Sequence, residues 1–264
     1  MNSCYTLHQK NNILYFSINR FEIYTNIIHA FSTKRTGISK LPFESLNLGY
    51  CQKDSNVNVN TNRKLFLEAL SLSNYKLISP NQTHSDIFYQ ANQETANNEI
   101  IADALYTTEP GLILSIQTAD CLPLILYEPY NSIIAIAHLG WKGLLNKLII
   151  KMITHICNTY SVKAKSLIIG IGPAIQQCCY EIKEDVLELF KKEFIFTNEC
   201  VRYEDSKIKF DLLHMLLLQL WELHASQKNV SWIKLCTHCN PQYFFSYRRE
   251  GPTGRLMTVI CKIP

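Results

Sequence analysis

The sequence contains no stretch of about 18 apolar residues, so none of its segments has the character of a membrane-spanning helix. Its first residues lack the basic start and apolar core of a secretion signal, and we therefore expect a cytoplasmic protein. Runs of lysine and arginine never exceed two residues, and the formal charge is only +4. Surfaces that follow nucleic-acid phosphates need denser positive charge, so neither nucleic acid nor a membrane is the expected partner.

Internal repeats and Pro/Gly/Ser-rich linkers are also missing from the 264 residues. A chain of this length with 47% hydrophobic residues can bury one large core. We therefore expect one domain over residues 1–264, and a monomer. The ten cysteines of a cytosolic chain are expected to stay reduced, most as core residues and one or two with a chemical role.

Short runs of β-branched and aromatic residues predict strands, and apolar residues at helical spacing predict four helices. The clearest helical pattern covers residues 143–160, and the other helices are expected to begin near Val57, Glu184 and Asp211, with Asp211 as an N-cap. The predicted strands are 12–18, 26–33, 75–79, 112–117, 122–128, 132–138, 166–172, 231–236 and 256–263. Strands and helices mix without strict alternation, which predicts an α+β fold with mixed sheets.

Residues 122–138 have the pattern of a hairpin that turns at Glu128–Asn131. Such a hairpin places Cys121 beside His138 at one edge of a sheet. A thiol and an imidazole there would suit either a nucleophile with its base or two ligands of a zinc ion. The structural alternative is a buried cysteine and a hydrogen-bonded core histidine, which on these two residues alone is the commoner case.

His84, in "NQTHSD", lies where a polar loop meets an apolar run, and it adds a third candidate ligand. Two histidines and a cysteine can hold Zn²⁺ and leave a fourth position for water, whose pKa then falls towards about 7. A structural zinc would need a fourth protein ligand, and none stands at motif spacing. The three residues therefore favour a catalytic zinc.

Two further cysteine features are interpreted as structural. "CTHC", Cys236 to Cys239, has the C-x-x-C spacing but lacks the second pair that a zinc ribbon requires. The neighbours Cys178 and Cys179 alone indicate no chemistry. The nearby "GIGPAI" lacks the pattern of a phosphate-binding loop and is interpreted as a tight turn.

Arginines gather in the loop "SYRREGPTGR", which contains Arg248, Arg249 and Arg255, and Arg35 stands in another glycine-containing loop. Planar guanidinium groups bind phosphate or carboxylate through two hydrogen bonds at once, so these loops are candidates for anion binding. A solvated turn is the equally weighted alternative.

Seven ordered motifs resemble the laccase-domain family, also called the multicopper polyphenol oxidase or YfiH type, whose members are described as purine nucleoside phosphorylases. The motifs span nearly the whole chain: "FSTKRTGIS", "SLNLG", "NQTHSD", "DALYTTEPGLILSIQTADCLPLIL", "AHLGWKG", "GIGPAIQQCCYEI" and "FFSYRREGPTGR". The resemblance implies a layered α/β/β/α sandwich and a catalytic zinc at His84, Cys121 and His138.

The resemblance also implies phosphorolysis of adenosine, inosine, guanosine and methylthioadenosine with inorganic phosphate, together with deamination of adenosine. On this basis Arg35 and Arg248 are the candidates for binding phosphate or ribose, with Asn47 and Gln82 as further polar candidates. Lys142 stands where the family commonly has an arginine, and a lysine cannot reproduce a two-point contact.

Three alternatives remain open at this point. Cys121 and His138 could serve a cysteine hydrolase, and the family's peptidoglycan-editing label suggests a protein that handles cell-wall precursors. Copper chemistry on phenols is disfavoured, because multicopper sites need more histidines than this set provides.

Overall fold

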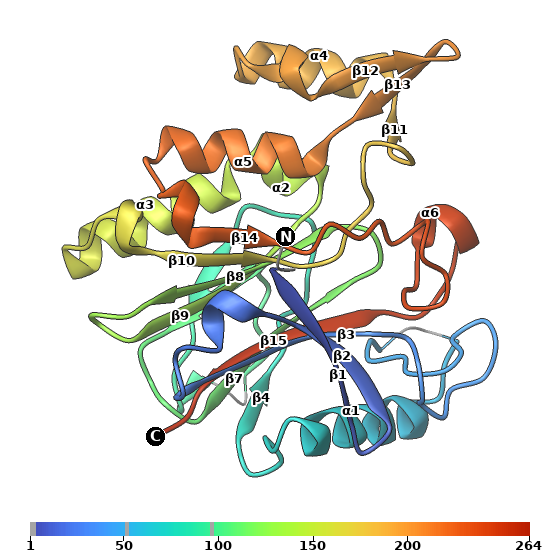
Figure 1. Ribbon diagram of the computed structural model, residues 1–264, viewed down its shortest axis with the longest axis vertical. Helices are drawn as coiled ribbons and strands as arrows, with labels where there is room; N and C mark the ends of the chain where they lie inside the picture. Colours follow the sequence, from blue (N-terminus) through green and yellow to red (C-terminus); the bar gives the residue numbers. More distant parts are fainter. Residues whose placement is uncertain (1–3, 51–52, 96–97) are drawn as a thin grey trace.

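The computed structural model describes residues 4–50, 53–95 and 98–264, and Figure 1 shows two large sheets layered between helices. The first sheet has the strand order β1-β2-β3-β15-β7-β4. Its strands are β1 Tyr5–Lys10, β2 Ile13–Ile18, β3 Ile27–Ser32, β15 Leu256–Lys262, β7 Leu112–Thr118 and β4 Lys76–Ile78. All neighbours pair antiparallel except β4 and β7, so the sheet is mixed.

The second sheet has the order β14-β10-β8-β9-β6-β5 and is also mixed, with parallel pairs at both edges. Its strands are β14 Val230–Trp232, β10 Ile168–Ile171, β8 Leu122–Glu128, β9 Ile133–Leu139, β6 Ala104–Thr107 and β5 Phe88–Gln90. Every residue of β6, β8 and β9 is buried, since both faces of this sheet are covered. Their nearly continuous apolar sequences follow from that burial.

Helices cover the outer faces of the two sheets (Figure 1). Those on the two large sheets are α1 Asn56–Ala69, α2 Trp141–Leu145, α3 Leu148–Tyr160 and α5 Leu212–Glu222. Helix α4 Glu184–Glu193 lies beyond α5, and the short helix α6 Tyr247–Glu250 belongs to the arginine loop. Short 3-10 helices in the described part of the chain include Asn19–Phe21, Ala164–Ser166, Thr197–Cys200 and Gln227–Asn229. A third, small sheet of β11 Glu181–Ile182, β13 Lys207–Phe210 and β12 Val201–Glu204 lies beside α4.

Three groups of buried apolar side chains hold the layers together. The middle group joins the two large sheets, with Leu114 and Ile116 of β7 on one side and Ile125, Ile134 and Ile136 of β8 and β9 on the other. A second group packs α2, α3 and α5 on the outer face of the second sheet, and a third packs α1 on the first sheet. The predicted α+β sandwich with mixed sheets is confirmed.

The hairpin prediction is confirmed as well. Strands β8 and β9 pair antiparallel with Pro123 opposite His138, and Glu128 accepts hydrogen bonds from the backbone of Tyr130 and Asn131 in the turn. Asp211 caps α5 as predicted, because its Oδ1 accepts from the His214 backbone N–H at 2.9 Å.

The prediction of one helix over residues 143–160 is wrong in one respect, because the chain forms two helices there, α2 and α3. Lys147 adopts a left-handed conformation (φ 61°) between α2 and α3, and the Asn146 N–H bonds back to the Lys142 carbonyl. The apolar periodicity continues across this break, since both helices bury their apolar faces against the second sheet.

No helix in the described part of the chain combines the length and the apolar character needed to cross a bilayer.

Candidate active site

The three predicted metal ligands come together near one end of the inner strands β8 and β9 of the second sheet. Cys121 directly precedes β8, His138 lies near the end of β9, and His84 comes from the loop between β4 and β5. The Sγ of Cys121 lies 3.9 Å from Nε2 of His84, and the ligand atoms of all three residues lie within 4.8 Å of one another. His84 is exposed, Cys121 is partly exposed and His138 is only 4% exposed.

Unusual backbone conformations bring the three candidate ligands close to one another. His84 and the Asp120 that precedes the cysteine both have positive φ angles, 58° and 108°. Gly140 leaves the space between the ligands open: a Cβ there would lie 3.1 Å from both the Cys121 Sγ and the His84 ring. A glycine at this position therefore permits the close approach of the loop to the strand.

Asp103, just before β6, organises the site from behind and was not among the predicted site residues. It is fully buried, and Oδ1 accepts from Nδ1 of His138 at 2.7 Å. Its carboxylate also accepts from the backbone N–H groups of Thr83, His84 and Ser85 and from the Ser85 hydroxyl. Burial alone would raise the pKa of Asp103, but the hydrogen bonds from His138 and Ser85 outweigh burial and lower it to about 2.

The ionised Asp103 fixes the tautomer of His138. Because this carboxylate can only accept, the histidine donates from Nδ1, which leaves Nε2 for the cluster. Burial opposes charge on both His138 and Cys121, yet their mutual attraction raises the pKa of the imidazole and lowers the pKa of the thiol. Each of the two groups therefore favours the charged form of the other.

This donor set fits a zinc ion. A thiolate and two imidazoles suit the borderline-soft zinc ion, and a carboxylate behind a ligating histidine is the usual support for such a ligand. Among the described residues, no fourth cysteine, histidine or carboxylate belongs to this group. Three protein ligands are typical of catalytic zinc rather than structural zinc.

The ligand cluster forms one wall of a cavity of about 490 Å³, a volume that accommodates a small molecule. Two predicted substrate-binding residues, Gln82 and Arg248, line this cavity. The other lining residues are Tyr50, Pro80, Asn81, His84, Gln117, Thr118, Ala119, Asp120, Cys121, His138, Ile175, Tyr180, Tyr247 and Arg255. Three tyrosines and two arginines thus share the cavity with the ligands.

Arg248 and Gln82 differ in how much of their hydrogen-bonding capacity the protein uses. Arg248 lies over the Tyr180 ring at 5.1 Å and donates from Nη1 to the Glu181 carbonyl. Within the described ranges its Nε and Nη2 make no hydrogen bond, so they are available to a ligand. Gln82 instead bonds through both ends of its amide to the backbone of Gln117.

Arg35 and Asn47 are not among the residues that line the cavity. Arg35 is exposed on its loop. Asn47 is fully buried: it donates to Asp54, and its Oδ1 accepts from the backbone of Gly49 and Arg255. In this structure Asn47 therefore supports the loop that carries Arg255. Lys142 is also absent from the cavity wall, and its Nζ lies 5.7 Å from the Trp141 ring centre.

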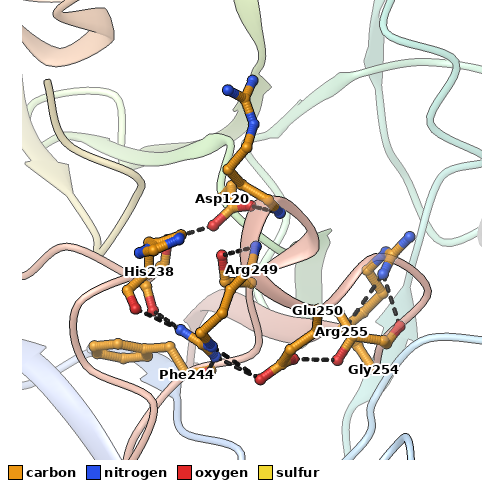
Figure 2. A network of polar contacts seen from close by, with 11 residues as sticks. Asp120, His238, Phe244, Arg249, Glu250, Gly254 and Arg255 are labelled. Carbon is orange, nitrogen blue, oxygen red and sulfur yellow. Dashed lines mark hydrogen bonds and ion pairs between the residues drawn. The ribbon is translucent and has the colours of Figure 1, made fainter. Parts of the chain in front are cut away.

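A network of polar contacts joins the arginine loop to the site (Figure 2). Asp120 accepts from the Thr237 hydroxyl at 2.6 Å and from the Arg248 backbone N–H at 2.7 Å. Arg249 donates to the carbonyls of Thr237, His238 and Phe244, and it also pairs with Glu250. Its guanidinium is therefore committed to the scaffold, whereas that of Arg248 faces the cavity.

The family model described as "Multi-copper polyphenol oxidoreductase laccase" matches residues 28–262. The chain belongs to this family. The purine nucleoside phosphorylase YlmD of Bacillus subtilis is 28% identical over 247 residues, 89% of this chain and 88% of the relative. A purine nucleoside phosphorylase of Haemophilus influenzae is 32% identical over 239 residues, 88% of this chain and 93% of the relative.

Solved structures show the same fold. The hypothetical protein YfiH of Bacillus licheniformis superimposes with a TM-score of 0.88 at 28% identity, covering 94% of this chain and 96% of that one. YlmD of Geobacillus stearothermophilus also gives 0.88, at 25% identity, covering 98% and 99%. The names of the curated relatives support an enzyme.

Proposed function

We propose that this protein is a zinc-dependent purine nucleoside phosphorylase, acting on adenosine, inosine, guanosine and methylthioadenosine, with adenosine deaminase activity. The observation that carries the proposal is the position of the His84, Cys121 and His138 cluster in the wall of a cavity that also holds arginines and tyrosines. The names of the relatives supply the substrate class, and the cavity chemistry agrees with it.

The cavity can receive both substrates of a phosphorolysis. Tyr247 offers an aromatic face on which a purine can stack, whereas arginines already lie over one face of Tyr50 and of Tyr180. Arg248 and Arg255 offer guanidinium groups to phosphate. In the reaction, a phosphate oxygen bonds to C1′ of the ribose as the bond from C1′ to the purine nitrogen breaks. The electron pair passes to the purine, which takes up a proton and leaves.

His84, Cys121 and His138 would hold the zinc ion, which when bound supplies a Lewis acid and makes water reactive near neutral pH. Asp103 keeps Nε2 of His138 aimed at the cluster and holds the His84 loop through its backbone N–H groups. Asp120 positions Arg248 by accepting from its backbone. These contacts are present before a substrate binds, so fewer side chains lose conformational entropy on binding.

The proposal is tested with adenosine, inosine, guanosine and methylthioadenosine, each with and without inorganic phosphate, read by product chromatography. Free base and ribose 1-phosphate, or methylthioribose 1-phosphate from methylthioadenosine, are expected only with phosphate, and adenosine should also give inosine. The Cys121→Ala variant should lose both activities, while Cys157→Ser, on α3 and outside the cavity, should keep them. Absence of base release from every nucleoside in the presence of phosphate would contradict the proposal. A parallel set of peptidoglycan precursors tests the editing alternative.

One observation favours a second candidate, a cysteine hydrolase. The Cys121 Sγ and a ring nitrogen of His138 lie within 4.8 Å of each other, and the lowered pKa of the thiol and raised pKa of the imidazole would suit a nucleophile beside a general acid. Metal analysis separates the two, because a zinc ion held through Cys121 occupies the thiolate. Purified protein without stoichiometric metal, whose Cys121 reacts rapidly with an alkylating reagent, would favour the hydrolase. Stoichiometric copper with phenol oxidation would instead favour the oxidase.

A further inference from the structure

A second group of potential metal ligands lies outside the catalytic cluster and is formed by four cysteines. Cys178 and Cys179 belong to the turn after β10, and Cys236 and Cys239 belong to the turn after β14. Their four Sγ atoms all lie within 4.8 Å of one another. The sequence shows no second cysteine pair at the spacing that a zinc ribbon requires. In the folded chain, however, Cys178 and Cys179 lie beside the C-x-x-C pair and form a second pair. We call these residues the four-cysteine cluster.

We propose that the four-cysteine cluster binds a zinc ion in a closed, structural site.

Backbone pairing holds the two cysteine turns side by side without the help of a metal. Ala174 pairs with Cys236 in an isolated parallel bridge, and the Thr237 N–H donates to the Ala174 carbonyl at 3.1 Å. This bridge extends the pairing of β10 with β14, so the two cysteine turns follow from neighbouring strands of one sheet. The cluster is thus positioned by the fold and not by flexible chain ends.

The sulfur atoms lie at separations that a small adjustment would bring to tetrahedral ligation, because one distance matches it and another is about 0.5 Å shorter. For Zn–S bonds of about 2.3 Å, tetrahedral geometry places neighbouring sulfur atoms about 3.8 Å apart. The Sγ of Cys239 lies 3.8 Å from that of Cys178 and 3.3 Å from that of Cys179. A disulfide would require about 2.05 Å, and all four cysteines are free thiols here.

The surroundings of the cluster also suit a metal thiolate site. The Gln176 backbone N–H points to the Sγ of Cys236 at 3.4 Å, and such donors stabilise negative charge on sulfur. Cys236 is 7% exposed, whereas Cys178 and Cys239 are exposed, so a metal can enter from the surface. Four thiolates fill the coordination of zinc and leave no position for substrate, which marks the site as structural.

The location of the cluster indicates what the metal would do. Cys179 directly precedes Tyr180, which lines the cavity, and Thr237 lies between the other two cysteines and donates to Asp120. A metal at the cluster would therefore tie together two chain segments that frame the cavity, about 60 residues apart in sequence, as a crosslink does. This inference does not depend on the proposed reaction.

The deciding measurement uses the His84→Ala/Cys121→Ala variant, in which the catalytic cluster is disabled. The protein is purified under reducing, oxygen-free conditions, supplied with zinc alone, desalted and measured by elemental analysis and X-ray absorption. One zinc per chain with four sulfur ligands at about 2.3 Å supports the inference. No retained zinc, or zinc bound partly by nitrogen, overturns it. Failure of the catalytic proposal would not change this result.

A second pair of variants tests the same site in the otherwise unchanged chain. Cys178→Ser/Cys239→Ser should hold one zinc fewer than the unsubstituted protein, whereas Cys4→Ser, an exposed cysteine elsewhere, should lose none. With cobalt in place of zinc, the thiolate charge-transfer absorption should fall strongly in the double variant only. Equal zinc content in both variants overturns the inference. So does a Cys179–Cys239 disulfide found by mass spectrometry in the oxygen-free protein.

Discussion

His138 and Asp103 are joined twice: Nδ1 of the imidazole donates to Oδ1 of the carboxylate at 2.7 Å, and the His138 backbone N–H donates to the Asp103 carbonyl at 2.7 Å. The second bond lies where β9 and β6 run side by side. The orientation of the histidine is therefore set both by its own side chain and by the sheet. Asp103 is the positioning residue of the site.

Replacement of Asp103 by asparagine should lower zinc affinity and catalytic rate by about 10- to 100-fold, the range found for groups that support a metal ligand. The amide cannot accept from the imidazole, the loop backbone and Ser85 as the carboxylate does, so the His138 tautomer is no longer fixed. Zinc competition titration measures the affinity. Asp86→Asn is the matched control, because Asp86 lies on the loop that carries His84 but pairs with Lys151 at the surface. Equal effects of the two substitutions would contradict the positioning role.

Gly140→Ala should reduce zinc affinity about tenfold while changing the unfolding midpoint little. Its φ of −81° suits alanine, but the added methyl would lie 3.1 Å from the Cys121 Sγ and the His84 ring and would push these ligands apart. Gly143→Ala serves as the control, because the nearest atom to its Cβ would be at 3.6 Å, an ordinary contact. An unchanged zinc affinity in Gly140→Ala would contradict the prediction, because the His84 loop would then make room for the methyl group at no cost in binding free energy.

Arg248→Ala should raise the KM for phosphate roughly tenfold, in line with the loss of a hydrogen bond to a charged group. Arg248→Lys should restore little of the affinity, because an ammonium group cannot form the two-point contact of a guanidinium. Initial rates at varied phosphate and saturating nucleoside provide the measurement. Arg202→Ala, an exposed arginine paired with Glu204, should leave KM unchanged. An unchanged KM in Arg248→Ala would remove this residue from phosphate binding.

His29 should make the folded state less stable as the pH falls. Burial lowers the pKa of His29 to about 3, and the neutral ring accepts from the Ile18 backbone N–H at 2.8 Å. Between pH 6.5 and about 3 the unfolded chain binds a proton at this position and the folded chain does not. This contribution to stability is complete above pH 6.5 and is lost on acidification, with a slope of up to about 1.4 kcal/mol per pH unit.

Urea unfolding of the metal-free protein at pH 7, 6, 5 and 4 measures this slope. His29→Gln keeps an acceptor for Ile18 but does not titrate, so its free energy of unfolding should fall less steeply with pH. The exposed His224 provides the control substitution, His224→Gln, whose slope should match that of the unsubstituted protein. Parallel curves for all three proteins would rule out the role assigned to His29.

The hairpin of β8 and β9 could be predicted from sequence because its information is local. A turn at Glu128–Asn131 between two apolar runs fixes the register, and the register alone places Cys121 near His138. His84 was found by its setting at the end of a polar loop. Asp103 was missed as a site residue because an aspartate before a buried strand shows no sign of its partners, which lie about 20 and 35 residues away.

The other differences have both distant and local causes. The cysteine turns meet only because β10 and β14 pair, and a sequence cannot show which strands are neighbours in a sheet. The break at Lys147 leaves the helical periodicity nearly intact, so the pattern predicts one helix. Strands β12 and β13 alternate apolar and charged residues about a two-residue turn, a hairpin signal that the strand predictions overlooked. Strand β11 has only two residues, too few to show an alternation.

Asp103, Cys121 and His138 stand at the ends of three adjacent strands of one sheet, β6, β8 and β9. His84 and the arginines and tyrosines of the cavity stand instead on loops or on the short helix α6. The relative positions of these three strand-end groups are thus set by a hydrogen-bonded ladder that also holds the protein core. Exchange of loop residues can alter which molecule is recognised without disturbing that ladder. Reaction chemistry and substrate choice can therefore diverge independently during evolution on this scaffold.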